Sequence, residues 1–388
     1  MPSRPSSVPS IPGIKAGHDL AQMLRAEIAE MLGRGRNLTF PVGAQPISFA
    51  RKHLDELKCE DYYLCEKSDG IRCLLYFTYD GDREAHYLID RKNDYYFVPY
   101  LHFPMPDDPT FRGFHRETLV DGELVLDDVG GPRPLLRYLI FDCLILDKKH
   151  VMNRTLDKRL AYFREYVYNP YENLIQKFPQ VLDDFPFQVA IKKMEFSYAI
   201  HMMFQDVLPN LPHGNDGLIF TCRTSPYRFG TDQNILKWKP AEENSIDFRL
   251  NLEFPLISRE DLEGDDEDES DTDSMAPDYD AMPKFNLSVF MGEGRYEKWA
   301  EMYVTPLEWD EFKSMGKPLD EEIVECAMDD QGRWRFLRLR TDKKEGNHIS
   351  TVNSVIESIR DGVGKEDLMA AAKEIRAAWK ARLPGQQH

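Results

Sequence analysis

The sequence of 388 residues contains no apolar segment that approaches the ~20 residues needed to cross a membrane. Its longest candidate, residues 138–146, is interrupted by Asp142. The N-terminal residues are rich in proline and serine and lack the apolar core of a signal peptide. We therefore expect no membrane partner, and we interpret residues 1–15 as a disordered arm.

Cysteine is scarce and scattered. None of the six cysteines belongs to a Cys-x-x-Cys pair. This spacing argues against a disulfide framework and against a cysteine-ligated zinc site. Reduced thiols of this kind are typical of the cytosol or the nucleus.

Basic residues are outnumbered by acidic ones, 49 against 67, and the formal net charge is −18. Such a balance is unfavourable for binding nucleic acid. However, residues 258–282 hold twelve acidic side chains and one arginine, a net of −11 that leaves −7 for the rest of the chain. We interpret this segment as a disordered acidic insertion, so the folded part can still include a site for an anion.

Apolar periodicity predicts an α+β chain of two domains, the first spanning residues 16–240. An amphipathic pattern with core residues such as Leu156 and Phe163 predicts a helix over 155–168. Other helices are expected at 19–32, 51–57 and 198–207, and strands at 62–66, 72–79, 86–91, 95–98, 118–126, 138–146, 187–194, 216–221 and 235–239.

Residues 241–345 have a different pattern of short β segments, at 246–254, 285–292, 323–328 and 334–340, with the acidic insertion between the first two. Several short strands with turn signals favour a small barrel of the OB type. Residues 346–388 contain two helical patterns, 349–361 and 365–383. The second has an apolar face that is expected to pack on another element, and the two tail helices together can pack back on the first domain.

A cluster of charged residues, Lys-Ser-Asp-Gly-Ile-Arg at 67–72, interrupts an apolar strand pattern. Burying such charges is costly unless they meet partners. A lysine amine becomes a nucleophile when burial or neighbouring cations lower its pKa. Gly70 permits close approach of a phosphate, and Arg72 can fork onto phosphate oxygens. Taken alone, the cluster could equally be a solvated hairpin turn.

Further charged residues lie in strands where the pattern calls for apolar ones. Lys237 and Lys239 are two residues apart and therefore share one face of a strand. Singly, each such residue is more simply explained as a surface salt bridge. Together they supply what phosphoryl or nucleotidyl transfer requires: cations for the phosphates, carboxylates for a ribose or Mg²⁺, and one activated nucleophile. The cations are Lys67, Arg72, Arg91, Lys237, Lys239, Arg340 and Lys343, and the carboxylates Glu123, Asp216 and Asp247.

Six segments, in order, resemble the motifs of the covalent nucleotidyltransferases, which comprise mRNA capping guanylyltransferases and ATP-dependent ligases. Passages at 40–54, 88–98 and 118–125 further resemble the fungal mRNA guanylyltransferases, the alpha subunits of capping enzymes. The resemblance implies a ligase-type, ATP-grasp-like domain of antiparallel sheets followed by an OB-fold barrel. The six segments are 67–72, 121–123, 138–142, 216–220, 236–239 and 340–343.

This resemblance implies a reaction in two steps. Lys67 attacks the α-phosphate of GTP, pyrophosphate leaves, and a covalent lysyl–GMP forms. A 5′-diphosphate RNA end then takes the GMP to give a GpppN cap. Arg72 and Lys239 are expected near the α-phosphate, and Lys237 at the base or a phosphate.

The remaining roles are also implied by the resemblance. Arg91 and Glu123 hold the ribose, and Phe141 stacks on the guanine, with Tyr138 as an alternative. Asp216, with Glu123, binds Mg²⁺ or Mn²⁺. Arg340 and Lys343, acting with Asp247, reach the β- and γ-phosphates when the two domains close.

Partners and location follow from the same resemblance. They are a separate RNA 5′-triphosphatase subunit and the phosphorylated carboxy-terminal repeats of RNA polymerase II, which places the protein in the nucleus. Two other hypotheses remain: an ATP-dependent polynucleotide ligase using the same lysine, and a non-catalytic platform that binds the polymerase. Only some 65 residues precede Lys67, with no sign of an extra DNA-binding domain, which disfavours the ligase.

Overall fold

The computed structural model describes residues 9–35, 43–131, 133–240, 244–258, 275–329 and 331–383. The chain divides into two compact units. Unit 1 comprises residues 1–239 and 365–388, and unit 2 comprises residues 240–364. No helix among the described residues is long and apolar enough to span a membrane.

Unit 1 contains an eight-stranded sheet in the order β1-β6-β5-β4-β7-β8-β10, with β9 paired to β8 beside this path. The pairings are antiparallel except for that of β10 with β8. Its strands are β1 (Ile14–Lys15), β4 (Ile71–Asp80), β5 (Arg83–Ile89), β6 (Tyr95–Val98), β7 (Thr118–Asp127), β8 (Leu135–Leu146), β9 (Lys149–His150) and β10 (Gln188–Ile191).

This sheet is covered on both faces. Strand β4 shows the alternation, since Phe77 lies in one apolar cluster and the adjacent Tyr76 in another. Helix α1 (His18–Met31) packs on the Tyr76 side, and helices α3 (Leu156–Phe163) and α4 (Asn169–Lys177) pack on the Phe77 side. Because both faces are buried, the central strands are continuously apolar and any charge in them needs a partner.

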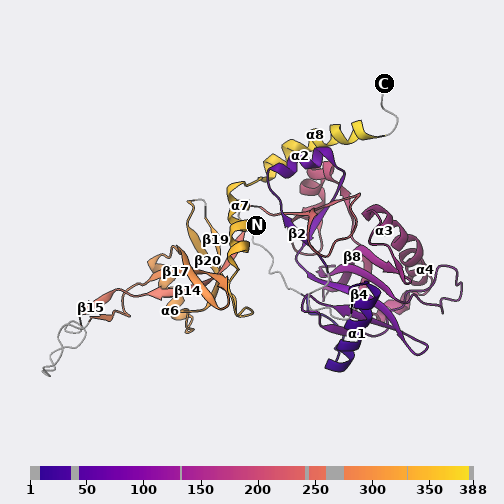
Figure 1. The fold of residues 1–388 in the computed structure, drawn as a ribbon, viewed down its shortest axis with the longest axis horizontal. Coiled ribbons are helices and arrows are strands. Elements are labelled where there is room, and N and C mark those ends of the chain that lie inside the picture. Colours follow the sequence, from indigo (N-terminus) through magenta and orange to yellow (C-terminus); the bar gives the residue numbers. More distant parts are fainter. Residues whose placement is uncertain are drawn as a thin grey trace. The chain divides into compact units, whose positions relative to one another are not determined.

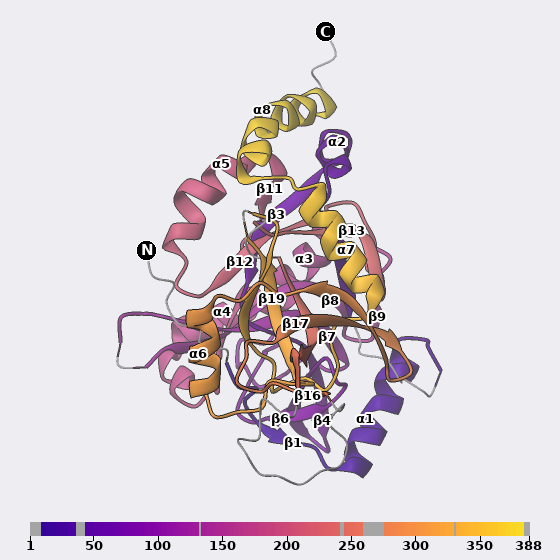
Figure 2. The ribbon, with the colours of Figure 1, turned by 90° about the vertical axis from the view of Figure 1, so that its left-hand side faces the viewer.

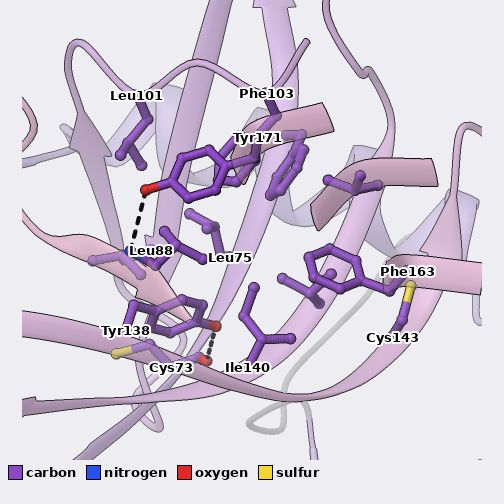
Figure 3. Close-up of a cluster of buried hydrophobic side chains, with 14 of the residues drawn as sticks. Cys73, Leu75, Leu88, Leu101, Phe103, Tyr138, Ile140, Cys143, Phe163 and Tyr171 are labelled. Atoms are coloured by element: carbon purple, nitrogen blue, oxygen red, sulfur yellow. Dashed lines mark hydrogen bonds between the residues drawn. The ribbon is translucent and has the colours of Figure 1, made fainter. Parts of the chain in front are cut away.

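Two buried tyrosines fix the packing on the Phe77 side (Figure 3). The Tyr138 hydroxyl donates to the Cys73 carbonyl oxygen at 2.8 Å, and the Tyr171 hydroxyl accepts from the backbone N–H of Val189 at 3.3 Å. A buried tyrosine hydroxyl needs such a partner. Each ring is therefore held in one orientation within the core.

A second, five-stranded sheet of unit 1 has the order β11-β3-β12-β13-β2. Strand β13 pairs with β2 in parallel, and the other pairings are antiparallel. The strand expected at 235–239 begins earlier, at Gly230. The strands are β2 (Ala44–Ser48), β3 (Tyr62–Ser68), β11 (Glu195–Phe196), β12 (Asn215–Cys222) and β13 (Gly230–Trp238).

The helix expected at 155–168 consists of α3 and a π-helical turn, and the chain continues directly into α4. The helix expected at 198–207 is a series of short helical turns. The remaining helical elements of unit 1 are α2 (Lys52–Cys59), η1 (Arg164–Tyr168), η2 (Pro179–Asp183), η3 (Ser197–Ala199), α5 (Ile200–Met202), η4 (Met203–Val207), η5 (Leu208–Asn210) and α8 (Lys365–Arg382).

The C-terminal tail is divided between the units. Helix α8 lies beside α2 in unit 1 (Figure 2), where Trp379 packs against Phe196 and Tyr198 with ring centroids 5.4 and 4.8 Å apart. Lys58 on α2 also pairs with Glu374 at 2.8 Å. The tail was expected as one segment, 346–388, but its first helix, α7 (Ile349–Arg360), belongs to unit 2.

The prediction of a disordered arm over residues 1–15 is wrong at its C-terminal end. Residues 1–8 lie outside the described part, but Ile14 and Lys15 form β1 and pair with Phe97 and Tyr96. Lys15 also contacts Asp94 at 2.7 Å. The edge of β6 offers unpaired backbone groups, and this short strand satisfies them.

Unit 2 is a five-stranded barrel. The sheet order is β18-β17-β14-β19-β20, and a parallel bridge between Met302 and Trp334 joins its two edges. Helix α6 (Pro306–Ser314) connects the third strand to the fourth. This order and closure are those of an OB-type barrel. The strands are β14 (Ser245–Glu253), β17 (Lys284–Gly292), β18 (Arg295–Glu301), β19 (Ile323–Met328) and β20 (Trp334–Leu339).

Helix α7 contributes Val352 to the apolar core of this barrel. A separate two-stranded ladder pairs β15 (Leu256–Ser258) with β16 (Met275–Pro277). It follows β14 and precedes β17 in the sequence, and it extends away from the barrel (Figure 1). Most of the expected acidic insertion, residues 259–274, lies outside the described residues.

Strands β7 and β8 pack closely at Gly122, which lies on β7. A Cβ there would lie 2.5 Å from Tyr138 Cζ and 2.8 Å from the Leu139 carbonyl oxygen. We expect Gly122→Ala to destabilise the protein by about 1–3 kcal/mol, as overpacking of a core does. Chemical denaturation measures this. Gly131→Ala, whose Cβ would meet nothing closer than 3.8 Å, is the control, and equal stability of the two variants would contradict the packing described.

Candidate active site

Lys67 lies near the end of β3, which pairs with β12. That pairing is interrupted by a bulge around Gly217. Gly217 has a φ of +145°, and a Cβ there would lie 2.1 Å from the Trp238 carbonyl oxygen. Only glycine fits such a position. The bulge leaves the neighbouring Asp216 side chain in contact with Lys67.

Asp216 joins two lysines, Lys67 on β3 and Lys239 directly after β13. Its Oδ1 accepts a hydrogen bond from Lys67 Nζ at 2.6 Å, and its Oδ2 lies 2.5 Å from Lys239 Nζ. Burial would raise the pKa of Asp216, but the charges and hydrogen bonds of the two lysines outweigh it and lower this pKa. One ionised carboxylate therefore holds both ammonium groups.

Lys67, Lys239 and Arg91 all lie near Lys237, and these four basic residues are here called the cation cluster. Burial lowers the pKa of Lys237, and the charges of the other three lower it further. Among the described residues, neither Lys237 nor Arg91 has an ion-pair partner. A group of cations with one carboxylate between them favours an incoming polyanion.

Arg72 is held differently. Its Nε donates to Asp121 Oδ1 at 3.0 Å and its Nη2 to Asp121 Oδ2 at 2.5 Å, and Nη1 donates to the Ala44 carbonyl oxygen. Asp121 is fully buried and also accepts from the Tyr227 hydroxyl at 2.6 Å. This two-point pairing fixes the guanidinium. Contact of Arg72 with an α-phosphate stays a prediction.

Glu123 lies opposite Arg72 in the pairing of β4 with β7. Burial raises its pKa, although Lys192 and Lys67 oppose the shift. Lys192 Nζ lies 3.6 Å from Glu123 Oε2, and it donates to Ser68 Oγ at 2.6 Å. Lys192 thus links Glu123 to Ser68, the residue after Lys67.

The two aromatic candidates for stacking on a base differ in exposure. Phe141 is half-buried, with the Arg72 guanidinium 5.4 Å from its ring centroid. Tyr138 is fully buried, and its hydroxyl is bonded to Cys73. The alternative assignment to Tyr138 is therefore wrong, because its ring belongs to the core, and Phe141 remains the candidate.

The predicted residues of unit 2 come together within that unit. Arg340 Nη1 lies 3.0 and 3.1 Å from the two carboxylate oxygens of Asp247, which also contacts Lys343. Arg340 further pairs with Asp342 at 2.8 Å and lies 3.6 Å from Glu325. Hydrogen bonding to Asp342 and the nearby carboxylates raise the pKa of Arg340.

The fit of a metal ion can be judged from the carboxylates. The described residues contain no group of three or more potential metal ligands. Asp216 is the carboxylate placed in the cation cluster, so a divalent cation would take part of its coordination shell from a bound phosphate. Mg²⁺ commonly binds in this way, through one or two carboxylates and substrate oxygens.

Sequence reasoning missed Lys192 and His213. Lys192 is buried and pairs with Glu66 at 3.3 Å. The signal was present, since Lys192 follows an apolar strand directly and was included in the strand expected at 187–194. Its carboxylate partner comes from a strand more than a hundred residues away, which no local pattern reveals.

The fold and the site together define a class, the covalent nucleotidyltransferases: a two-sheet domain with a lysine in a cation cluster, and an OB-type barrel. Within this class, the chain belongs to the mRNA capping enzyme family. The family's catalytic domain matches residues 7–241, and its C-terminal domain matches residues 243–369. The resemblance seen in the motifs is thereby confirmed.

Relatives from fungi are similar over nearly the whole chain. The mRNA-capping enzyme subunit alpha of Neurospora crassa is 51% identical over 383 residues, which cover 96% of this chain and 93% of that protein. The subunit of the same name from Schizosaccharomyces pombe is 48% identical over 377 residues, covering 96% and 89%.

Solved structures are less similar. A mycobacterial DNA ligase D complexed with ATP matches 79% of this chain and 96% of its own, at 15% identity and a TM-score of 0.36. An ATP-dependent DNA ligase from bacteriophage T7 matches 78% and 99%, at 15% identity and a TM-score of 0.34. Scores this low support no conclusion on activity.

The Asp216 contacts predict a pH-dependent contribution to stability. Because the folded-state pKa of Asp216 is lowered, its stabilisation is present above the ordinary carboxyl pKa and is lost as the pH falls through the folded value. We expect Asp216→Asn to cost roughly 1–3 kcal/mol at pH 7, the range for a lost hydrogen bond to a charged group. Denaturant unfolding at pH 7 and pH 3 measures it.

The difference between Asp216→Asn and the unchanged protein should shrink toward pH 3. Asp183→Asn, which alters an exposed carboxylate of unit 1, is the control and should change stability little at either pH. A cost for Asp216→Asn that is the same at both pH values would contradict the charge pairing.

Proposed function

We propose that this protein is an mRNA guanylyltransferase that transfers GMP from GTP to the 5′-diphosphate end of RNA through a covalent bond to Lys67. The observation that carries the proposal is the placement of Lys67 Nζ, 2.6 Å from Asp216 and within the cation cluster. Membership of the capping enzyme family supports it. Relatives named as alpha subunits of capping enzymes support it as well.

In the first step, the Lys67 amine attacks the α-phosphorus of GTP. A phosphorus–nitrogen bond forms, the bond from the α-phosphorus to the oxygen bridging to the β-phosphate breaks, and pyrophosphate carries that electron pair away. The amine reacts after losing a proton. The hydrogen bond to Asp216 orients it, so that attack and departure can be in line.

The cation cluster provides the electrostatic part of catalysis. Lys239, and Arg72 if it exchanges its carboxylate partner, stabilise charge at the α-phosphate, and Lys237 binds a phosphate or the base. Arg91 and Glu123 bind the ribose. Such preorganised charges stabilise the transition state because they need no reorganisation as the reaction proceeds.

The base is held by stacking. Phe141 is half-buried beside Arg72, and a purine on its outer face would gain apolar contact and some of the cation–π attraction. We assign the guanine of GTP to this ring, and the choice of GTP over ATP rests on membership of the capping enzyme family.

A divalent cation, Mg²⁺ or Mn²⁺, would be held by Asp216 and the phosphate oxygens, with Glu123 as the second candidate ligand. It would neutralise charge on the phosphates when bound. The protein's own part is to release Asp216 from Lys67 and Lys239 as the phosphates arrive.

In the second step, a terminal phosphate oxygen of the 5′-diphosphate RNA attacks the phosphorus of lysyl–GMP. The new phosphorus–oxygen bond completes GpppN, and the phosphorus–nitrogen bond breaks to return the Lys67 amine. A 5′-diphosphate end presupposes an RNA 5′-triphosphatase, for which a partner subunit is proposed because the relatives are named subunit alpha. Action on nascent RNA also implies the nucleus and the phosphorylated repeats of RNA polymerase II.

Arg340 and Lys343 of unit 2 are proposed to bind the β- and γ-phosphates of GTP in the first step. In the structure both contact Asp247. Asp247 holds both cations until a phosphate replaces it.

The nucleophile is tested by label transfer from GTP labelled at the α-phosphate, followed by a denaturing gel. We expect the unchanged protein to become labelled and Lys67→Ala to show no label, because the amine proposed to form the phosphorus–nitrogen bond is gone. Lys193→Ala, an exposed lysine of the same unit, is the control and should label normally. Label on Lys67→Ala would overturn the assignment of the nucleophile. Efficient labelling by ATP would favour a ligase.

The role of unit 2 is tested by Arg340→Ala in the same assay. We expect a loss of about 100-fold or more in the labelling rate, comparable to removal of one charged donor from a transition state. Arg338→Ala is the matched control, since Arg338 lies two residues earlier, near the end of β20, is 66% exposed and pairs with Glu325. Equal rates for the two variants would remove Arg340 from the mechanism.

A further inference from the structure

His213 lies in the loop before β12, and its ring is held between two carboxylates of unit 1. Nδ1 lies 2.8 Å from Asp127 Oδ1 at the end of β7, and Nε2 lies 3.5 Å from Glu66 Oε1 on β3. The His213 side chain is only 8% exposed, and Nε2 has no hydrogen-bond partner among the described residues. None of the roles assigned above uses this residue.

The two carboxylates are buried and belong to a chain of alternating charges. Asp127 is 2% exposed and Glu66 is 5% exposed. Arg137 Nε lies 3.2 Å from Asp127 Oδ2, and Lys192 Nζ lies 3.3 Å from Glu66 Oε1. From β8 to the active site, the chain therefore runs Arg137, Asp127, His213, Glu66, Lys192 and Glu123.

The charge balance of this chain favours an imidazolium. Three carboxylates, including Glu123, face two permanently basic side chains and His213. Burial alone would lower the pKa of His213, but the hydrogen bond to Asp127 and the charge of Glu66 raise it to about 9. In this form both ring nitrogens carry a proton, one directed to each carboxylate.

The inner end of the chain reaches the nucleophile's turn. Glu66 accepts from Ser68 Oγ at 3.2 Å, and Lys192 donates to the same oxygen at 2.6 Å. Ser68 directly follows Lys67, so the position of the turn depends on where the Glu66 carboxylate sits.

The His213 loop is also tied to this turn through the backbone. Asp69 donates its N–H to the Gly214 carbonyl oxygen at 2.9 Å, and Asp128 donates its N–H to the Pro212 carbonyl oxygen at 2.7 Å. The loop is thus fastened on both sides of His213, and it leads directly into the strand that carries Asp216.

We propose that His213 is a positioning residue for nucleotidyl transfer: by bridging Asp127 and Glu66, it fixes Glu66 against Lys192 and Ser68 and so holds the turn next to Lys67. Loss of the imidazole charge leaves two buried carboxylates facing one another across the ring. Repulsion then loosens Glu66, and with it the turn. This inference rests on the proposed function.

The proposal has a signature in pH. Because the folded-state pKa lies above the ordinary value of 6.5, the contribution of His213 is complete below about pH 6.5 and is lost as the pH rises through about 9. The groups that face His213 from neighbouring elements are Asp127 and Glu66, backed by Arg137 and Lys192.

The experiment measures the initial rate of lysyl–GMP formation between pH 6.5 and 10 for the unchanged protein and for His213→Gln. We expect the unchanged protein to be about 10-fold faster at pH 7, a loss typical of a slightly misplaced reacting group. The ratio of the two rates should approach 1 at pH 10, with its midpoint near pH 9. His201→Gln, an exposed histidine of the same unit, should show a ratio of 1 throughout.

A double-mutant cycle identifies the partner. In a Glu66→Gln background, His213→Gln should have little further effect, since its target carboxylate is gone. If His213→Gln does not fold, His213→Lys takes its place: a lysine ammonium keeps its charge past pH 9, so the decline of the rate near pH 9 should disappear.

The outcomes separate the two proposals. A ratio that differs from 1 but is independent of pH would show a merely structural role for His213 and overturn the positioning inference alone. A ratio of 1 at every pH would also overturn it. Absence of label in the unchanged protein at every pH would overturn the proposed function, and the inference with it.

Discussion

The shared contact of Lys67 and Lys239 with Asp216 is the interaction on which the site depends. Two ammonium groups, one on β3 and one directly after β13, meet at one carboxylate, at 2.6 and 2.5 Å. Without that carboxylate, the cation cluster would be four mutually repelling charges in a partly buried place. The Gly217 bulge that delivers Asp216 is therefore as much a part of the site as the lysines are.

The same constraint explains the charges buried deeper in unit 1. Arg159 is 1% exposed, and its guanidinium contacts both oxygens of Asp142 at 2.7 and 2.8 Å. Asp142 lies opposite Asp121 in the pairing of β8 with β7, and Asp121 in turn binds Arg72. Removing one partner of such a pair leaves a buried charge without its counter-ion, which costs more free energy than the pair itself contributes. The pairs thus fix strand positions near the site.

Much of the fold could be predicted from the sequence, because alternation and helical spacing are local. The strand at 323–328 was predicted to the residue, and most others to within a few residues. The division of the tail could not be predicted: an apolar stripe on α8 shows that the helix packs, but not that Trp379 meets Phe196. The same limit hid Lys192 and His213, whose partners are distant in sequence.

The ion-pair partners of the cations indicate the order in which these side chains would bind GTP. Lys237 and Arg91 have no ion-pair partner in the described part of the chain, so a phosphate can bind them without breaking a contact. Lys67 and Lys239 must first exchange Asp216 for the substrate, and Arg72 must leave a two-point pair with Asp121. Exchange at Asp216 is the easier of the two, because it is about a quarter exposed while Asp121 is fully buried. Under the proposed function, the arriving phosphates would therefore displace Asp216 from Lys67 and Lys239 before Arg72 leaves Asp121.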